Sequence, residues 1–350
     1  MDLHQQTMIY GRADQMIDKK HKTEWCIIDE SVKGVSHERS GQPNQDAVAR
    51  FPTLSDSLPL ILAISDGHGG TKYFRSDKGA SFAVAAAIDT LSWFQESLAS
   101  FSNSSWLEEH LTKSLVNTWR GKVNAHLNDE PFTNEDLRSL EEKEGPTARQ
   151  IVEGNPVLAY GATILVVMIT ESFIAYLQLG DGDIVTVSEQ GKPNSVFPVN
   201  SKHFANETTS LCSSNAWYDF QFRIEKVSPS SVLPALILLS TDGYKDSFSS
   251  DEEFRKVGSD LFEMLHSNKL EEVKSSLAGW LSEATRIGSG DDITLGILYR
   301  IDAFQDLDVS QSIEQEQEDH KKGEGLELDA QSGHCHGSLQ PDQAELWNTF

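Results

Sequence analysis

Cysteine, positive charge and long apolar runs are scarce in this sequence. Its three cysteines, Cys26, Cys212 and Cys335, are odd in number and far apart, so they fit neither a disulfide framework nor a zinc-site spacing. The 29 Lys and Arg residues face 54 Asp and Glu residues, and the net charge of −25 argues against binding to a nucleic-acid backbone. The apolar runs are too short to span a bilayer, and MDLHQQTMIYGRAD lacks the basic start and apolar run of a secretory signal. We therefore expect a cytoplasmic protein that binds neither nucleic acid nor membrane.

The chain divides into three parts by composition. Residues 301–350 carry twelve Asp and Glu residues against two Lys, a net charge of −10, and Gln, Ser and Gly fill much of the rest. Such a segment cannot bury a core, so we expect a disordered acidic tail. Residues 1–23 are expected to be a flexible lead-in. The sequence thus predicts one folded domain at residues 24–300.

Within that domain, β-branched and apolar runs bounded by turn residues predict strands. They lie at Leu58–Ser65, Thr163–Thr170, Phe173–Leu179, Asp183–Ser188, Val232–Ser240 and Ile293–Arg300. Helices are expected from Ser76, as a cap, to Leu98, over Trp106–Gly145, and from Leu270 to about Gly288. Strands come in adjacent pairs without strict strand–helix alternation, which favours an α+β fold of antiparallel sheets covered by helices.

Acidic residues stand at the ends of four predicted strands. Asp66 lies in SDGHGG, Asp181 in LGDGD and Asp242 in STDG, and Asp291 and Asp292 precede the last strand. Asp-Gly alone is common turn chemistry, but four such strand ends in one chain are not explained by turns. Carboxylates gathered there would repel one another unless a cation lay among them, and Mg²⁺ and Mn²⁺ prefer oxygen ligands.

These motifs together resemble the metal-dependent serine/threonine phosphatases of type 2C. The likeness runs from Glu24 to Arg300 through NQDA, SDGHGG, LGDGD, STDGYKDSF and SGDDITLGIL, in the order of the family's acidic motifs. GVSHERSGQPNQDA and FANETTSLC are most similar to a bacterial branch. The resemblance implies an α-β-β-α sandwich, in which two stacked antiparallel sheets are flanked by helices.

The resemblance also implies roles for individual residues. Two Mn²⁺ or Mg²⁺ ions would share Asp66, with the Gly67 carbonyl, Asp242 and Asp291 completing their ligands. Asp46 would serve the second ion directly or through water, and Asp181 with Asp242 a third, weaker site. His68 would be the general acid that protonates the leaving oxygen.

The chain departs from the family pattern at several positions. Gln45 stands where a Glu is common, and Gly41 occupies the place of the usual phosphate-binding arginine. Arg39, two residues away, is the candidate substitute. Asp292 replaces a common Asn, and Gly182-Asp183 a common Ser-Arg.

The implied reaction is hydrolysis of phosphoserine and phosphothreonine in proteins by a metal-activated water, without a covalent intermediate. The expected partners are a phosphorylated protein substrate and an opposing Ser/Thr kinase, and we expect a monomer. One alternative is a catalytically inactive family member that only binds phosphoproteins, prompted by Gln45 and the missing arginine. Another is a metal-dependent nuclease or nucleotide hydrolase, which the charge of −25 and the lack of a P-loop disfavour.

Overall fold

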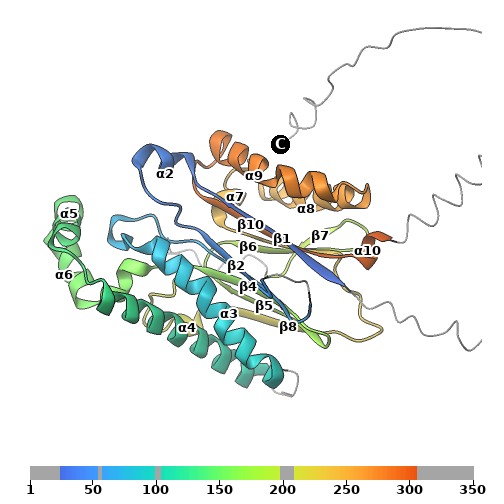
Figure 1. The fold of residues 1–350 in the computed structure, drawn as a ribbon, viewed down its shortest axis with the longest axis horizontal. Helices are drawn as coiled ribbons and strands as arrows, with labels where there is room; N and C mark the ends of the chain where they lie inside the picture. Colours follow the sequence, from blue (N-terminus) through green and yellow to red (C-terminus); the bar gives the residue numbers. More distant parts are fainter. Residues whose placement is uncertain (1–23, 54–56, 99–103, 198–208, 306–350) are drawn as a thin grey trace, which may run out of the picture.

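A computed structural model of the chain describes residues 24–53, 57–98, 104–197 and 209–305 (Figure 1). Its strands are β1 (Trp25–Val32), β2 (Ala47–Phe51), β3 (Leu60–Ser65), β4 (Ile164–Ile169), β5 (Phe173–Leu179), β6 (Asp183–Val187), β7 (Pro193–Ser195), β8 (Gln221–Lys226), β9 (Leu236–Ser240) and β10 (Ile293–Arg300). Its α-helices are α2 (Val35–Ser40), α3 (Ser76–Leu98), α4 (Ser104–Asp129), α5 (Asn134–Glu144), α6 (Pro146–Gly154), α7 (Asp242–Lys245), α8 (Asp251–His266), α9 (Leu270–Ile287) and α10 (Asp302–Gln305). Short 3-10 helices are η1 (Thr71–Tyr73), η2 (Pro156–Tyr160) and η3 (Ala216–Tyr218). Residues 1–23, expected to be a lead-in, and residues 306–350 of the expected tail lie outside the described residues.

The strands form two antiparallel sheets that stack face to face, flanked by helices. One sheet has the order β1-β10-β9-β6-β7 and the other the order β2-β3-β4-β5-β8. Figure 1 shows α3 and α4 outside the second sheet and α8 and α9 outside the first, with α5 and α6 toward one end. The fold is the α+β sandwich that the sequence predicted. No helix of the described residues combines the length and apolar character needed to cross a bilayer.

The apolar runs of the central strands are continuous because both of their faces are buried. In β4, Ile164, Val166 and Met168 pack toward α3 and α4, whereas Leu165, Val167 and Ile169 pack between the sheets. In β9, Leu236 and Leu238 face the α8–α9 layer, and Ile237 and Leu239 face the interior of the sandwich. Side chains alternate along a strand, so a strand buried on both sides needs apolar residues at every position.

The predicted strands are all present, with Phe173–Leu179 and Ile293–Arg300 as expected and the others one to four residues shorter at an end. Four further strands, β1, β2, β7 and β8, were not predicted. β8 has the sequence QFRIEK with no fully buried position, because it lies at a sheet edge and mixes polar and apolar residues. The stretch Trp106–Gly145 contains parts of two helices, α4 and α5, rather than one.

Two details of the sequence interpretation change at the ends of elements. α3 begins at Ser76 as expected, but the buried Ser76 hydroxyl makes no hydrogen bond, so it does not cap the helix. Residues 301–305, assigned to the tail, continue the folded part. The amide of Ile301 donates to the Glu24 carbonyl at 2.8 Å, and Phe304 packs against Phe262.

The contact between α3 and η2 gives a test of the fold. A Cβ at Gly79 would lie 1.9 Å from the Tyr160 carbonyl oxygen, and the Gly79 carbonyl already accepts the Trp119 indole N–H at 2.9 Å. We expect Gly79→Ala to lower the free energy of unfolding by at least ~2 kcal/mol, because the backbone must shift to admit the methyl group. Gly121→Ala in α4, which has open space around it, is the matched control. It should be neutral or stabilising by up to ~1 kcal/mol. Equal denaturation midpoints for Gly79→Ala and Gly121→Ala would contradict this packing.

Candidate active site

Antiparallel pairing brings the predicted acidic residues to one end of the sandwich. β2 begins directly after Asp46 and pairs with β3, so that Ala47 lies opposite Ser65, the residue before Asp66. β9 ends just before Asp242 and pairs with β10, which begins after Asp291 and Asp292. The two sheets are linked here through Asp46, whose side chain accepts hydrogen bonds from Thr241 and Thr294. Chain segments nearly 200 residues apart therefore meet at one place.

Asp46 is a buried carboxylate that joins the two sheets. Its Oδ2 accepts hydrogen bonds from the hydroxyls of Thr241 and Thr294, both at 2.8 Å, while its Oδ1 is buried without a partner. Burial raises the pKa of Asp46 from the usual 3.8 to about 8 despite the two hydroxyls, and the charges of Asp292 and Asp242 raise it further. In the folded protein without a cation, Asp46 would therefore hold a proton near neutral pH.

Asp66 and Asp242 contact each other directly. Burial raises the pKa of Asp66 well above its usual range, and the charges of Asp46, Asp242 and Asp291 act in the same direction. The proton on Asp66 is donated in a hydrogen bond to Asp242, whose pKa is raised to about 6, first by burial and then by Asp181. The electrostatic coupling shows that Asp46, Asp66, Asp181, Asp242 and Asp291 form one cluster. Asp181 and Asp291 lie at its exposed side.

The cluster offers unsatisfied oxygen atoms, as a site for a hard cation would. Besides Asp46 Oδ1, the Gln45 amide oxygen Oε1 is buried and has no hydrogen-bond partner in the part of the chain that the structure describes. It lies beside the loop that follows β3, since a Cβ at Gly69 would be 3.8 Å from it. Buried polar atoms without partners are rare and costly, and a divalent cation would satisfy them and the repelling carboxylates. The residues therefore fit Mg²⁺ or Mn²⁺.

The glycine after Asp66 is required by close packing. The Gly67 amide donates to the Gln45 carbonyl at 3.0 Å, and a Cβ at Gly67 would lie 2.6 Å from the Ser76 carbonyl oxygen. Any side chain at this position would separate the Asp66 loop from α3. Its φ angle is not in the left-handed region, so the constraint is space rather than backbone conformation.

His68 is half-buried at the edge of the cluster. Its backbone amide donates to the Gly161 carbonyl at 3.1 Å, and its ring meets the Tyr73 ring edge-on with 4.8 Å between centroids. Burial lowers the pKa of His68, the charge of Asp181 raises it, and that of Lys72 lowers it. The Lys72 ammonium lies over the Tyr73 ring, 5.0 Å from its centroid. The imidazole is therefore held between an anion and a cation.

Asp292 organises the backbone around the cluster, a role that the sequence did not reveal. Its Oδ1 accepts from the Gly34 amide at 2.6 Å, and its Oδ2 from the Gln45 amide at 2.6 Å and from His37 Nδ1 at 2.8 Å. The Asp292 side chain is 2% exposed, against 54% for its neighbour Asp291. Two adjacent aspartates thus differ in role: Asp292 is a structural acceptor, and Asp291 faces the cluster.

Some residues that support the cluster were not singled out from the sequence, although three of them lie within the quoted motifs. They are Thr241, Thr294 and His37, together with Thr163, whose hydroxyl accepts the Asp66 amide at 3.0 Å. The threonines lie next to the predicted acids in the chain or opposite them on a paired strand. Because threonine is common in strands, the sequence did not distinguish these threonines from others. His37 lies in the SH of GVSHERS, a stretch noted only for its resemblance.

The predicted phosphate-binding residue, Arg39, lies on the same short helix as His37. Arg39 is exposed on α2, and residues two positions apart on a helix do not share a face, so it does not follow His37 toward Asp291. Gly41 ends α2 with a φ of 73°, a conformation that suits glycine.

Asp183, which replaces a common Arg of the family, forms an ion pair with Lys245 at 3.3 Å.

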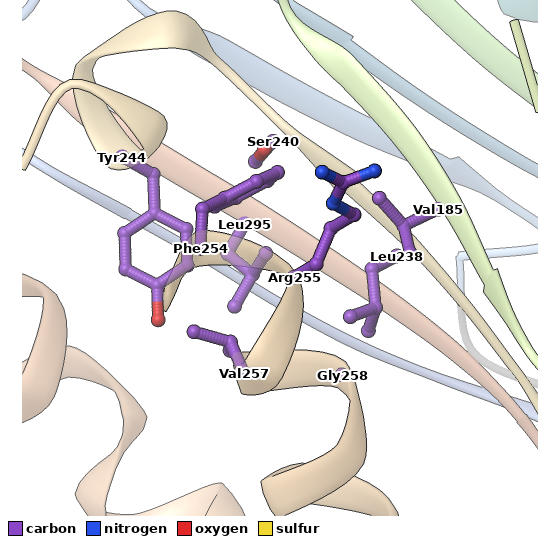
Figure 2. Close-up of a pocket in the computed structure, with 9 residues that line it drawn as sticks. All are labelled: Val185, Leu238, Ser240, Tyr244, Phe254, Arg255, Val257, Gly258 and Leu295. Carbon is purple, nitrogen blue, oxygen red and sulfur yellow. The ribbon is translucent and has the colours of Figure 1, made fainter. Parts of the chain in front are cut away.

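A small apolar pocket lies under α8, next to but separate from this cluster. Figure 2 shows Phe254, Val257 and Leu295 closing around it, with Tyr244 and Ser240 at its edge. None of the predicted site residues lines it. Ser240 and Tyr244 flank the segment that carries Asp242, so the pocket lies behind that segment.

The comparisons with known proteins point to one family. A family model described as protein phosphatase 2C matches residues 33–282, more than half of the chain. Its range ends before Asp291, so the last acidic motif lies outside the match. No curated protein matches the chain.

Several solved bacterial phosphatases are similar to the chain at low identity and low TM-score. PppA, a key regulatory component of T6SS in Pseudomonas aeruginosa, is 17% identical with a TM-score of 0.46, over 79% of this chain and 98% of that chain. The serine/threonine phosphatase PstP/Ppp of Mycobacterium tuberculosis is 14% identical with a TM-score of 0.42, over 79% and 98%. Stp1 from Staphylococcus aureus is 12% identical with a TM-score of 0.42, over 79% and 94%.

The raised pKa values predict how the metal-free protein responds to pH. Folded Asp46 binds its proton up to about pH 8 but unfolded Asp46 only to about 3.8, so the folded state binds more protons between these values. The free energy of unfolding in chelator should therefore contain a contribution that is present below about pH 4 and is lost as pH rises to about 8. In Asp46→Asn this decline should be smaller. Asp219→Asn, the same change at an exposed position, is the control and should show the same decline as wild type. Urea denaturation in excess chelator from pH 5 to pH 8.5 measures it, and equal slopes for Asp46→Asn and wild type would contradict the raised pKa.

Gln45 allows a test of the cation fit. Gln45→Glu adds a negative charge at the orphaned oxygen, and we expect Mn²⁺ to bind about 10-fold more tightly, equivalent to ~1.4 kcal/mol. Gln42→Glu makes the same change at an exposed position three residues away and should leave the affinity within about 2-fold. Calorimetric titration with Mn²⁺ compares the three proteins. Unchanged affinity in Gln45→Glu would mean that Gln45 Oε1 does not face a cation.

Proposed function

Because the chain belongs to the protein phosphatase 2C family and is therefore a protein serine/threonine phosphatase, we propose that it hydrolyses phosphoserine and phosphothreonine with a water activated by Mn²⁺ or Mg²⁺. The observation that carries this proposal is the cluster of five carboxylates at the strand ends, with unsatisfied oxygens and His68 at its edge. No covalent phosphoenzyme is required.

Two divalent cations are proposed at the cluster. Asp66 would serve both ions, the Gly67 carbonyl would bind one of them, Asp242 and Asp291 would complete the first site, and Asp46 would serve the second directly or through water. Asp181 with Asp242 provides a third, weaker site. When bound, such cations act as Lewis acids that lower the pKa of a water to about 7 and neutralise phosphoryl charge.

The protein's own residues orient the reaction. His68, held by Gly161 and Tyr73, is placed to give a proton to the departing serine or threonine oxygen. Burial lowers its pKa, which makes the imidazolium a stronger acid, while Asp181 favours the protonated form. Asp46 holds its position through Thr241 and Thr294, so a cation ligand is ready before any cation binds.

Phosphate binding and partners complete the proposal. Arg39 remains the candidate for contacting the phosphate, because its long guanidinium side chain is exposed on α2, the helix that carries His37. The proposed substrate is a phosphoprotein that an opposing Ser/Thr kinase modifies, and the proposed state is a cytoplasmic monomer. The alternative of an inactive phosphoprotein-binding module is not favoured, since Asp66, Asp242 and Asp291 are all present in the cluster.

Hydrolysis of a phosphothreonine peptide tests the proposed function. Wild type should release phosphate with Mn²⁺ or Mg²⁺ and lose activity in excess chelator. Asp242→Asn should reduce turnover at least ~100-fold, because it removes a charged ligand from the centre of the cluster. Asp219→Asn, the same change at an exposed position, should retain wild-type turnover. Full activity in chelator, or near wild-type activity of Asp242→Asn at moderate Mn²⁺, would overturn the proposal.

A further inference from the structure

His37 is a buried histidine at the cluster for which the proposed reaction has no role. It lies in α2, is 8% exposed, and comes within 2.8 Å of Asp292 Oδ2 through its Nδ1. α2 is fixed above the start of β10, because the Ser36 amide donates to the Gly290 carbonyl at 2.9 Å and the Ser36 hydroxyl to the same oxygen at 2.6 Å. The ring therefore has a defined position and orientation.

The second ring nitrogen of His37 is directed at Asp291. Nε2 lies 3.9 Å from Asp291 Oδ1, too far for a hydrogen bond, and it makes no hydrogen bond within the described residues. Two ligand atoms of one ion are about 3.0 Å apart when adjacent and about 4.2 Å apart when opposite, for bonds of about 2.1 Å. The observed separation falls between these values.

Asp292 is excluded as a further ligand but explains the orientation of the ring. Its buried oxygens accept three hydrogen bonds, from Gly34, Gln45 and His37. The exposed Asp291, in contrast, accepts at Oδ1 a single hydrogen bond within the described residues, from the Asp292 amide at 2.8 Å, and keeps a lone pair for a cation. A carboxylate that accepts the Nδ1–H of a histidine leaves the Nε2 lone pair free to bind a metal, an arrangement common at metal centres. Asp292 thus acts on a cation only through His37.

We propose that His37 Nε2 and Asp291 Oδ1 bind a divalent transition-metal cation, so that the acidic cluster has one nitrogen ligand. This assignment rests on the proposed function for Asp291 as a metal ligand, and it adds a donor that the family resemblance did not imply. Imidazole favours Mn²⁺, Fe²⁺, Co²⁺ or Zn²⁺ over Mg²⁺, whereas carboxylates serve both kinds of ion. The consequence is a preference for transition metals at this side of the cluster.

The competing explanation is an imidazolium that pairs with both aspartates and binds no metal. The two explanations differ in whether a nitrogen atom contacts the ion, and Mn²⁺ itself serves as the probe. Pulsed electron paramagnetic resonance of the full chain, loaded with Mn²⁺, should show the ¹⁴N coupling of a bound imidazole.

The variant His37→Asn distinguishes the roles of the two ring nitrogens. The asparagine amide nitrogen can take the place of Nδ1 and still donate to Asp292, but nothing replaces Nε2. The ¹⁴N coupling should disappear, and Mn²⁺ should bind about 10-fold more weakly by calorimetry, with a change in Mg²⁺ affinity of less than about 2-fold. His266→Asn, at an exposed position of α8, should retain both the coupling and the affinities.

Three outcomes would overturn the assignment: no ¹⁴N coupling in Mn²⁺-loaded wild type, a coupling that persists in His37→Asn, and an equal loss of Mn²⁺ and Mg²⁺ affinity. The last would mean that His37 only supports the backbone. If His37→Asn fails to fold, the wild-type spectrum decides whether a nitrogen binds, and loss of the ¹⁴N coupling in His37→Gln, whose amide replaces Nε2 rather than Nδ1, assigns that nitrogen to His37. None of these measurements needs a phosphorylated substrate, so a failure of the proposed phosphatase activity would be seen separately.

Discussion

Repulsion among five carboxylates is the constraint on which the arrangement of this molecule's functional end depends. Burial raises the pKa values of Asp46, Asp66 and Asp242, and the charges of neighbouring carboxylates raise them too, so the bare site favours bound protons. Such a site lowers stability unless protons or cations neutralise it. The two antiparallel sheets, apolar on both faces of their central strands, hold these groups together against that repulsion.

Hydrogen bonds around the cluster also hold the carboxylates in place against their repulsion. Asp292, before β10, accepts hydrogen bonds from Gly34 and His37 at the start of α2 and from Gln45 before β2. Each of these hydrogen bonds joins residues about 250 positions apart in the chain. Thr241 and Thr294 hold Asp46 from the opposite sheet. Hydrogen bonds to charged groups are stronger than neutral ones, so a buried carboxylate with several donors is an effective clamp.

The same framework determines which chemistry is available. Glycine at position 67 lets the Asp66 loop approach α3, and Gly161 makes room for the rings of His68 and Tyr73. The proposed proton donor His68 thus lies near Asp181, and the proposed nitrogen ligand His37 near Asp291. A phosphoryl group bound there would meet cations on one side and an imidazole on another, as hydrolysis of a phosphate ester requires.

Much of this could be predicted from the sequence. Apolar runs bounded by turn residues predicted the strands β3, β4, β5, β9 and β10, and acidic residues at strand ends predicted a cation site, because these signals are local. The weak alternation in β8 and the mixed composition of β1 and β2 did not predict strands. These three strands lie at sheet edges, where pairing with a neighbour rather than the local sequence determines the structure.

What the sequence by itself determined is the sandwich of antiparallel sheets and the identity of the carboxylates. What only the tertiary structure decided is the role of each one. Asp291 and Asp292 are adjacent and chemically identical, yet one faces the cluster and the other is buried as a hydrogen-bond acceptor. His37 likewise becomes a candidate ligand only because Asp292, far along the chain, orients its ring. Burial and charge–charge distance set these roles, and both arise from contacts between segments that no local pattern relates.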